Sequence, residues 1–149
     1  MGYKSNGYLR QLSTFSMFFS LKMLYAVFAR SESLAQALHS PKLSLAKADS
    51  MVKALSSMWN SDRCDSRFAV LWDTVVREAD SLGVEPPVMP RVRRLPRRID
   101  DGSLQHDDQQ VEDVYRRLYF SLLDAAITCL SSRFQSAFEL ARNIESVLK

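Results

Sequence analysis

The chain has few of the residues that disulfide frameworks and metal sites need. Its 149 residues include two cysteines and two histidines. Cys64 and Cys129 are too few for a disulfide scaffold and neither belongs to a CxxC pair, so we interpret both as reduced, intracellular thiols. His39 and His106 match no known ligand spacing with each other or with the cysteines. The sequence therefore predicts no metal site and no cofactor.

Motifs of common catalytic sites are also absent. The four glycines form neither a Gly-rich phosphate loop nor a GxSxG nucleophile turn. Neither cysteine has an obvious histidine base nearby in the sequence. We therefore expect a protein that is not an enzyme and that takes no small-molecule substrate.

Long uncharged apolar runs are missing as well. The most apolar stretch runs from Phe15 to Ala29, and Lys22 lies in its middle. It is shorter than the roughly 18 residues that a membrane span needs, so we expect no membrane insertion. Because the stretch follows Lys4 and Arg10 and ends in a plausible signal-peptidase site, a cleaved signal peptide is the alternative interpretation.

The composition that remains is that of a helical globular protein. Hydrophobic residues make up 46% of the chain and charged residues 25%, and there are only five prolines. A single domain of this length buries roughly 68–70% of the surface that its unfolded chain exposes, which is enough for a core. We predict one all-α domain, a bundle of four to six helices with one long loop rich in proline and arginine.

The first helical region is expected at about residues 13–38. One apolar stripe recurs at steps of four, three and four, and it consists of Met17, Leu21, Leu24 and Phe28. Phe15, Phe18, Phe19, Tyr25 and Val27 add a second apolar face, which predicts a helix covered on two sides. The Ser31-Glu32-Ser33 stretch is expected to kink or break it, and Pro41 to end it.

Two further helices are expected at about residues 44–60 and 65–82. Ser44 and Asp65 are suitable N-caps, and Gly83 is a suitable stop for the second of these helices. Trp59 and Trp72 fall on the inward apolar stripes, so we predict that both pack in the core.

The last part of the chain carries the clearest helical pattern. We expect a central helix at about residues 109–134 and a shorter one at about 137–148. The first predicted stripe comprises Val111, Tyr115, Leu118, Leu122, Ala125 and Cys129. The second comprises Tyr119, Leu123, Ala126, Leu130 and Phe134.

One concentrated chemical feature lies in the expected loop at about residues 84–108. This segment holds Arg91, Arg93, Arg94, Arg97 and Arg98. Removing these five from the formal net charge of +3 leaves −2 for the rest of the chain, so the basicity is local. Guanidinium groups suit phosphate oxygens, which makes contact with the DNA backbone the sharpest interpretation. Nuclear import, or pairing with acidic helix surfaces, stays open as an alternative.

Charged residues of the long C-terminal pattern are expected to be structural. Glu112 with Arg116 and Asp113 with Arg117 have the spacing of solvated ion pairs along a helix. Asp124 lies in a segment that is apolar on two sides, and a buried carboxylate needs a partner. We predict a structural pair between Asp124 and an arginine such as Arg133.

Four motifs, in order, resemble the hAT superfamily of transposases, particularly the branch that contains the zinc finger MYM-type proteins. The string from Tyr115 to Phe134 is similar to that branch's Y-R…F…L-D-x-x-I-x-x-L-x-x-R-F pattern. The segment Pro87–Arg98 is similar to its P-x-x-P-R-x-R-x-x-P-R-R loop, and Arg63, Phe68 and Trp72 to its R-x4-F-x3-W pattern. The segment Leu34–His39 matches an L-S-x-x-L-Q pattern imperfectly, with Ala35 and His39 as departures.

This resemblance implies a place inside a larger architecture. In hAT transposases an all-α insertion interrupts a catalytic core, and the metal-binding carboxylates belong to that core. The resemblance therefore implies a non-catalytic, nuclear helical module, a fragment of a transposase-derived protein, that contacts DNA or contributes to assembly. The alternative is an interaction scaffold that docks on a transposase core or on a host protein.

Overall fold

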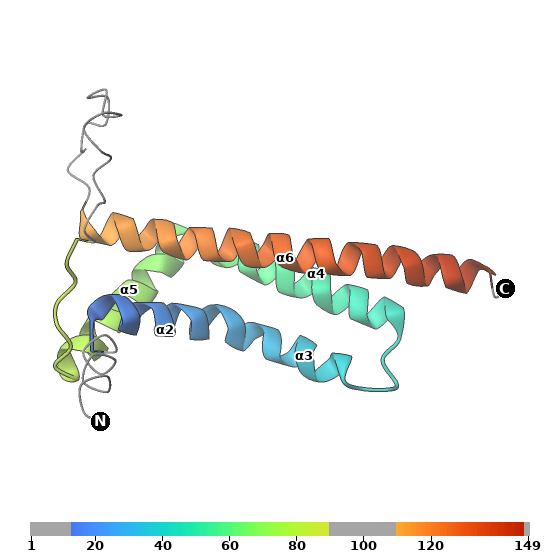
Figure 1. Ribbon diagram of the computed structural model, residues 1–149, viewed down its shortest axis with the longest axis horizontal. Coiled ribbons are helices and arrows are strands. Elements are labelled where there is room, and N and C mark those ends of the chain that lie inside the picture. Colours follow the sequence, from blue (N-terminus) through green and yellow to red (C-terminus); the bar gives the residue numbers. More distant parts are fainter. Residues whose placement is uncertain (1–12, 90–109, 148–149) are drawn as a thin grey trace, which may run out of the picture.

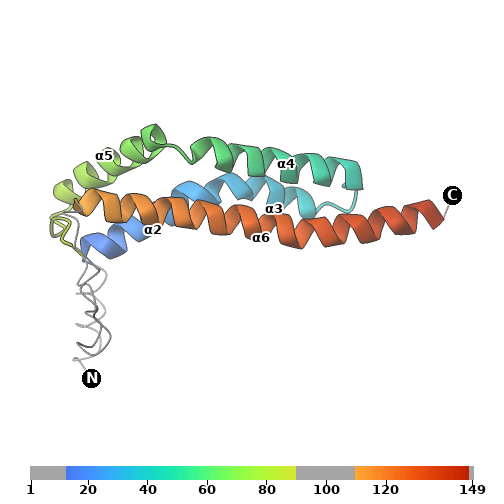
Figure 2. The same cartoon turned by 90° about the horizontal axis from the view of Figure 1, so that it is seen from above.

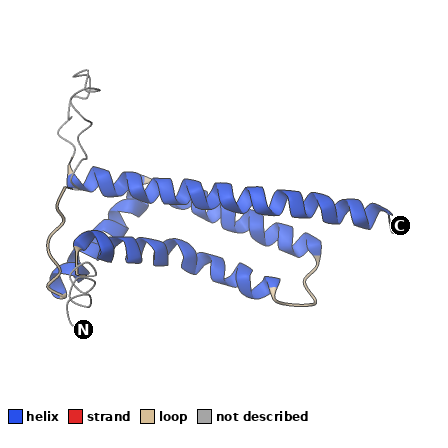
Figure 3. Cartoon of the chain, viewed as in Figure 1, coloured by secondary structure: helices blue, strands red, loops and turns tan. Residues whose placement is uncertain are grey.

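The computed structural model describes residues 13–89 and 110–147. All regular structure in these two ranges is helical, and they contain no strand (Figure 3). The prediction of an all-α bundle is confirmed.

The first helical region consists of two α-helices joined by one turn of 3-10 helix. Helix α2 spans Phe15–Phe28, the 3-10 helix η1 spans Ala29–Ser31, and α3 spans Glu32–Leu38. Thr14 caps α2 by accepting a hydrogen bond from the backbone N–H of Met17 at 3.4 Å. The break falls at the serine-rich stretch where the sequence predicted it.

The next two helices lie close to their expected bounds. Helix α4 spans Leu45–Asp62, and Ser44 accepts from the backbone N–H of Lys47 at 3.3 Å, as a serine N-cap should. Helix α5 spans Asp65–Ser81, but its N-cap is Cys64, so the cap predicted at Asp65 is wrong by one residue. Gly83 follows α5 with a φ of 67°, the left-handed conformation that stops helices.

The C-terminal part is one helix, α6, which spans Val111–Val147. The prediction of two helices, at 109–134 and 137–148, is therefore wrong. The residues at the expected break are Gln135 and Ser136, and neither removes a backbone donor or requires a special backbone angle. The rings of Phe134 and Phe138, one turn apart, contact each other in a tilted arrangement at a centroid distance of 5.6 Å, which supports the helix across that point.

The helices form an elongated bundle (Figures 1 and 2). Helix α6 runs the length of the molecule and packs mainly along α4, while α2 packs against α5. The C-terminal end of α6 extends past the connection between α3 and α4 (Figure 1). Helices α2 and α6 run in the same direction, because each begins at the end of the bundle where α5 finishes.

The core is strongly aromatic at the end of the bundle where α2 and α6 begin. Trp72 lies between Phe15, Phe19, Phe68 and Tyr115, with ring centroids 5.4 to 6.0 Å away. Burial raises the pKa of the Tyr115 hydroxyl above its ordinary value. This cluster joins α2, α5 and α6, since each of these helices contributes at least one ring.

Among residues 13–89 and 110–147, neighbours cover α2 on one side only, whereas the sequence predicted two covered faces. Its buried residues are Phe15, Phe19, Met23 and Val27. The stripe formed by Met17, Leu21, Leu24 and Phe28 is 38 to 51% exposed. We call this stripe the outer stripe of α2. The sequence could not separate the two faces because both are apolar.

Helix α6 shows the same asymmetry. Tyr115, Tyr119, Leu123, Ala126 and Phe138 are buried, which places the second predicted stripe largely in the core. Most of the first predicted stripe faces outward, and we call its members Leu118, Leu122, Ala125 and Cys129 the outer stripe of α6. Leu118 is 47% exposed, Ala125 and Cys129 are exposed, and Leu122 is half-buried.

Within residues 13–89 and 110–147, no helix combines the length and the apolar content that crossing a bilayer requires.

Candidate functional site: an apolar groove between α2 and α6

A groove of about 380 Å³ lies where the two outer stripes approach each other. We call it the α2–α6 groove. Its lining consists of Phe28, Trp59, Leu122, Ala125, Ala126, Cys129, Leu130, Arg133 and Phe134. Helix α2 therefore contributes Phe28, α4 contributes Trp59, and α6 contributes the rest. Eight of these nine side chains lack a formal charge, and Arg133 is the exception.

The two outer stripes lie at the same level along the bundle. Phe15 contacts Tyr115 at a centroid distance of 5.4 Å at one end, and Phe28 and Cys129 line the groove at the other end. The two helices are parallel, and each advances 1.5 Å per residue. Leu21 of α2 therefore stands level with Leu122 of α6. The groove itself takes Phe28 from the α2 stripe, and Leu122, Ala125 and Cys129 from the α6 stripe.

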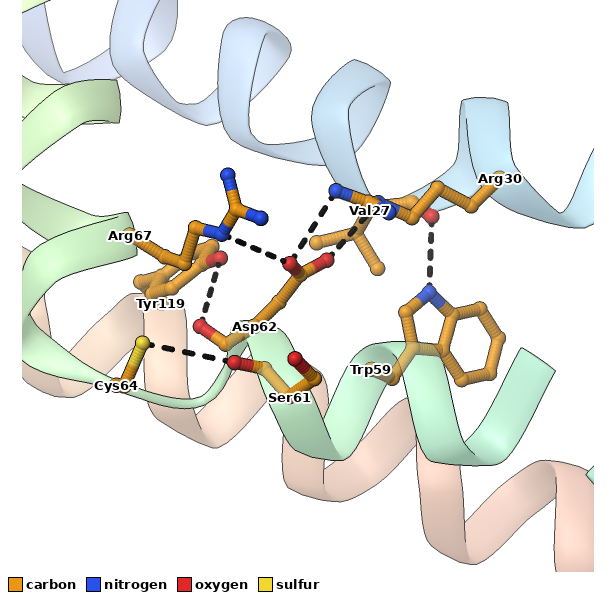
Figure 4. Close-up of polar contacts among 8 residues, drawn as sticks. All are labelled: Val27, Arg30, Trp59, Ser61, Asp62, Cys64, Arg67 and Tyr119. Carbon is orange, nitrogen blue, oxygen red and sulfur yellow. Dashed lines mark hydrogen bonds and ion pairs between the residues drawn. The ribbon is translucent and has the colours of Figure 1, made fainter. Parts of the chain in front are cut away.

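Trp59, which lines the groove from α4, is held in place by a buried hydrogen bond. Its indole N–H donates to the carbonyl of Val27 at 3.0 Å (Figure 4). Val27 lies in the last turn of α2, where backbone carbonyls lose their helical partners. The bond thus satisfies two buried polar groups at once and fixes the indole against α2.

One turn after Trp59, a buried carboxylate ties three elements together. Asp62, the last residue of α4, is 6% exposed. Arg30 of η1 donates to both of its oxygens, at 2.9 and 3.2 Å, and Arg67 of α5 lies 3.6 Å away (Figure 4). We call Arg30, Asp62 and Arg67 the Asp62 joint. Among the described residues, Asp62 is the one buried charged side chain.

Helix α6 joins this arrangement through Tyr119. Its hydroxyl donates to the backbone carbonyl of Asp62 at 3.3 Å (Figure 4). Burial raises the pKa of the Tyr119 hydroxyl, and the Asp62 carboxylate raises it further. The tyrosine therefore acts as a neutral donor that links α6 to the end of α4.

Asp124 pairs with an arginine, as the sequence predicted, but the arginine is Arg63. Its carboxylate accepts two hydrogen bonds from Arg63, at 2.6 and 3.0 Å, so the predicted partner Arg133 is wrong. The Asp124 side chain is 51% exposed, so its pair lies at the surface. The hydrogen bond from Arg63 lowers the pKa of Asp124. Arg63 also lies over the ring of Phe120, with 5.2 Å from its guanidinium carbon to the centroid.

Arg133 instead belongs to the groove. Within residues 13–89 and 110–147, no carboxylate lies within ion-pair distance of it, and its side chain is exposed. Phe134, which the sequence placed in a structural role, lines the groove beside it. The groove itself was missed by sequence reasoning, because the pattern of α2 and α6 predicted burial for the residues that form its walls.

The other ion pairs predicted for α6 differ in part from those observed, because Arg116 has other partners than the one expected. Arg116 pairs with Asp113 at 3.2 Å, one position closer than expected, and with Asp65 of α5 at 2.9 Å. The latter contact ties the start of α5 to the start of α6. Its long sequence separation of 51 residues explains why periodicity along a single helix could not reveal it.

Cys64, interpreted as a plain thiol, has a lowered pKa. The hydrogen bond with the Ser66 side chain is the largest cause, and the backbone N–H of Arg67 adds to it. Among the described residues, no three histidine, cysteine, aspartate or glutamate side chains gather into a set that could hold a metal ion.

The five arginines from Arg91 to Arg98 lie outside the described residues. The flanking elements are described: α5 ends and α6 begins at the same end of the bundle (Figures 1 and 2).

Comparisons with protein-family models, with curated proteins and with solved structures find no match to the chain. The relation to hAT transposases therefore rests on the sequence motifs alone and stays a prediction.

Proposed function

We propose that this chain is a non-catalytic helical docking module that assembles with another polypeptide through the α2–α6 groove. The polypeptide would be the remainder of a transposase-derived protein, as the sequence motifs suggest, or a host partner. The observation that carries the proposal is an apolar groove lined by Phe28 of α2 and by the outer stripe of α6, beside further exposed apolar side chains of α2.

The exposed apolar side chains form a contiguous surface, and this favours docking. Single exposed apolar residues are normal on protein surfaces, but contiguous apolar patches mark interaction sites. Covering the remaining surface of a leucine or phenylalanine that is 38 to 51% exposed contributes roughly 1 kcal/mol. The outer stripe of α2 alone offers four such side chains at helical spacing. A partner that covers both stripes therefore gains enough to offset part of the entropy cost of association.

The proposal is non-catalytic because the carboxylates that the sequence and the structure single out are already engaged. Asp124 is held by Arg63, and Asp62 is held by two arginines inside the bundle. Both arrangements tie helices together, and neither points a free carboxylate into the groove.

Photo-crosslinking from within the groove tests the docking proposal. A benzophenone amino acid at Ala125, which is exposed in the groove, should capture a defined partner in cells, and mass spectrometry should map the crosslink to a single segment of it. The same probe at Ala69, an exposed alanine on α5, is the matched control. The purified partner should then bind the native chain and lose binding to Ala125→Glu, but not to Ala69→Glu. Equal capture from both positions, or no capture from Ala125, would refute docking at this groove.

Contact with the DNA backbone is a second candidate function, and it rests on the five arginines from Arg91 to Arg98. If all five contact phosphates, the logarithm of the DNA-binding constant should fall with the logarithm of salt concentration with a slope of roughly −4 to −5. A form with all five changed to alanine should lose most of that slope. Identical salt series for the two forms would remove the DNA proposal, including the nuclear role that depends on it, and would leave the docking proposal untouched.

A further inference from the structure

We infer that the occupant of the α2–α6 groove is an amphipathic α-helix of another protein that carries a carboxylate for Arg133. This inference rests on the proposed docking function and adds the secondary structure and charge of the partner segment. Three observations lead to it: the shape of the groove, its one charged side chain, which has no carboxylate partner among the described residues, and the absence of suitable acids in the stripes themselves.

The shape of the groove selects a helix. Along α6 its lining repeats at steps of three and four residues, through Leu122, Ala125, Cys129 and Arg133, the spacing into which the side-chain ridges of another helix pack. The α6 lining from Leu122 to Phe134 extends about 18 Å at 1.5 Å per residue. A helix of three to four turns covers that length. Strand addition is the other common mode of peptide docking, but it needs a sheet edge, and the described ranges contain no strand.

The charge of the groove selects an acidic partner. Arg133 lines the groove near its C-terminal end on α6 and has no carboxylate partner among the described residues. A docked helix would remove part of its guanidinium from water, and desolvating an arginine is unfavourable unless a carboxylate meets it. An aspartate or glutamate near one end of the docked helix fits this position, and the guanidinium can hold it with two hydrogen bonds.

The charge of Arg133 also disfavours a second copy of this chain as the occupant of the groove. Between Met17 and Phe28 there is no acidic residue, and between Leu118 and Cys129 the single acid is Asp124. Asp124 is already bound to Arg63 through two hydrogen bonds. A copy that pressed either outer stripe into the groove would therefore bring no uncommitted carboxylate to Arg133.

Selection from a displayed peptide library tests this inference. The bait is the full chain, and the probe is a yeast-displayed library of 18-residue helix-favouring peptides with one face randomised. The native chain should enrich peptides with apolar residues at steps of three and four and an aspartate or glutamate near one end. An Arg133→Glu bait should instead enrich lysine or arginine at that position, and should bind the originally selected peptides at least about five-fold more weakly. Arg77→Glu, an exposed arginine on α5, should change neither result.

Each contrary outcome has a distinct meaning. Peptides that bind the native chain and lose binding to Ala125→Glu, yet show no acidic preference, would overturn the inference and leave groove docking intact. Peptides that bind native and Ala125→Glu chains equally, or no enrichment at all, would overturn the inference and count against docking as well. If sedimentation showed a dimer that Ala125→Glu abolishes, the occupant would be a second copy of this chain, and the inference of a helix from another protein would be overturned.

Arg133→Gln, which removes the charge without reversing it, should lose the acidic preference without gaining a basic one.

Discussion

At the scale of single residues, the Asp62 joint is the most consequential polar feature. It places a buried carboxylate at the end of α4 and satisfies it with Arg30 and Arg67 from two other elements. Removing one member of a buried ion pair leaves a partly desolvated charge without compensation. The same joint lies one turn from Trp59, so it also stabilises the floor of the groove.

Asp62→Asn should lower the free energy of unfolding by about 2 kcal/mol, less than for a fully buried pair because Arg30 is 35% exposed. Urea denaturation followed by circular dichroism measures this change. Glu78→Gln is the matched control, because Glu78 pairs with Lys22 at the surface, where a salt bridge contributes about 1 kcal/mol or less. If both variants lost the same small amount, the joint would have no special role in stability.

The Arg63–Asp124 pair predicts a pH dependence. The folded chain lowers the pKa of Asp124 below its ordinary value, so the pair stabilises the fold above the unfolded carboxyl pKa. That contribution disappears as the pH falls through the lowered, folded pKa. In a carboxyl NMR titration, Arg63→Gln should raise the pKa of Asp124 toward the ordinary 3.8. An unchanged pKa in Arg63→Gln would show that Arg63 is not the cause.

At the scale of elements, α6 differs most from expectation, since one helix replaces two. Backbone chemical shifts should be helical without interruption from Arg133 to Phe138. Ser136→Pro should break that run and destabilise the helix by about 3 kcal/mol, whereas Ser136→Ala should leave it intact. Coil-like shifts at Gln135 and Ser136 in the native chain would restore the two-helix interpretation.

Sequence patterns located the ends of helices well where a nearby side chain or backbone angle determines them. Ser44 marks the start of α4 through its own hydroxyl, and Gly83 marks the end of α5 through a backbone angle that suits glycine. Sequence patterns failed where burial and pairing depend on residues far away in the sequence. Two apolar faces on α2 predicted two covered sides, but the described residues supply neighbours for only one of them. Asp124 finds its partner 61 residues away, and periodicity within one helix carries no information at that distance.

At the scale of the whole molecule, the bundle has one well-filled interior and one open apolar face. The aromatic cluster and the Asp62 joint hold α2, α4, α5 and α6 together, while the α2–α6 groove has no covering element among the described residues. The arginine segment lies between α5 and α6 in the sequence and shares no residue with the groove, so our two candidate functions use different parts of the chain.

The most direct measurement of an open groove is the accessibility of individual methyl groups in the free chain. A soluble nitroxide should broaden the methyl NMR signals of Leu21, Leu24 and Leu118 about as much as those of Val70, which is 63% exposed. The signals of Leu55 and Leu123, which are 4% and 0% exposed, should be spared. Protection of the outer-stripe leucines at the level of Leu55 would show that the apolar face beside the groove is already covered, and would contradict the docking account.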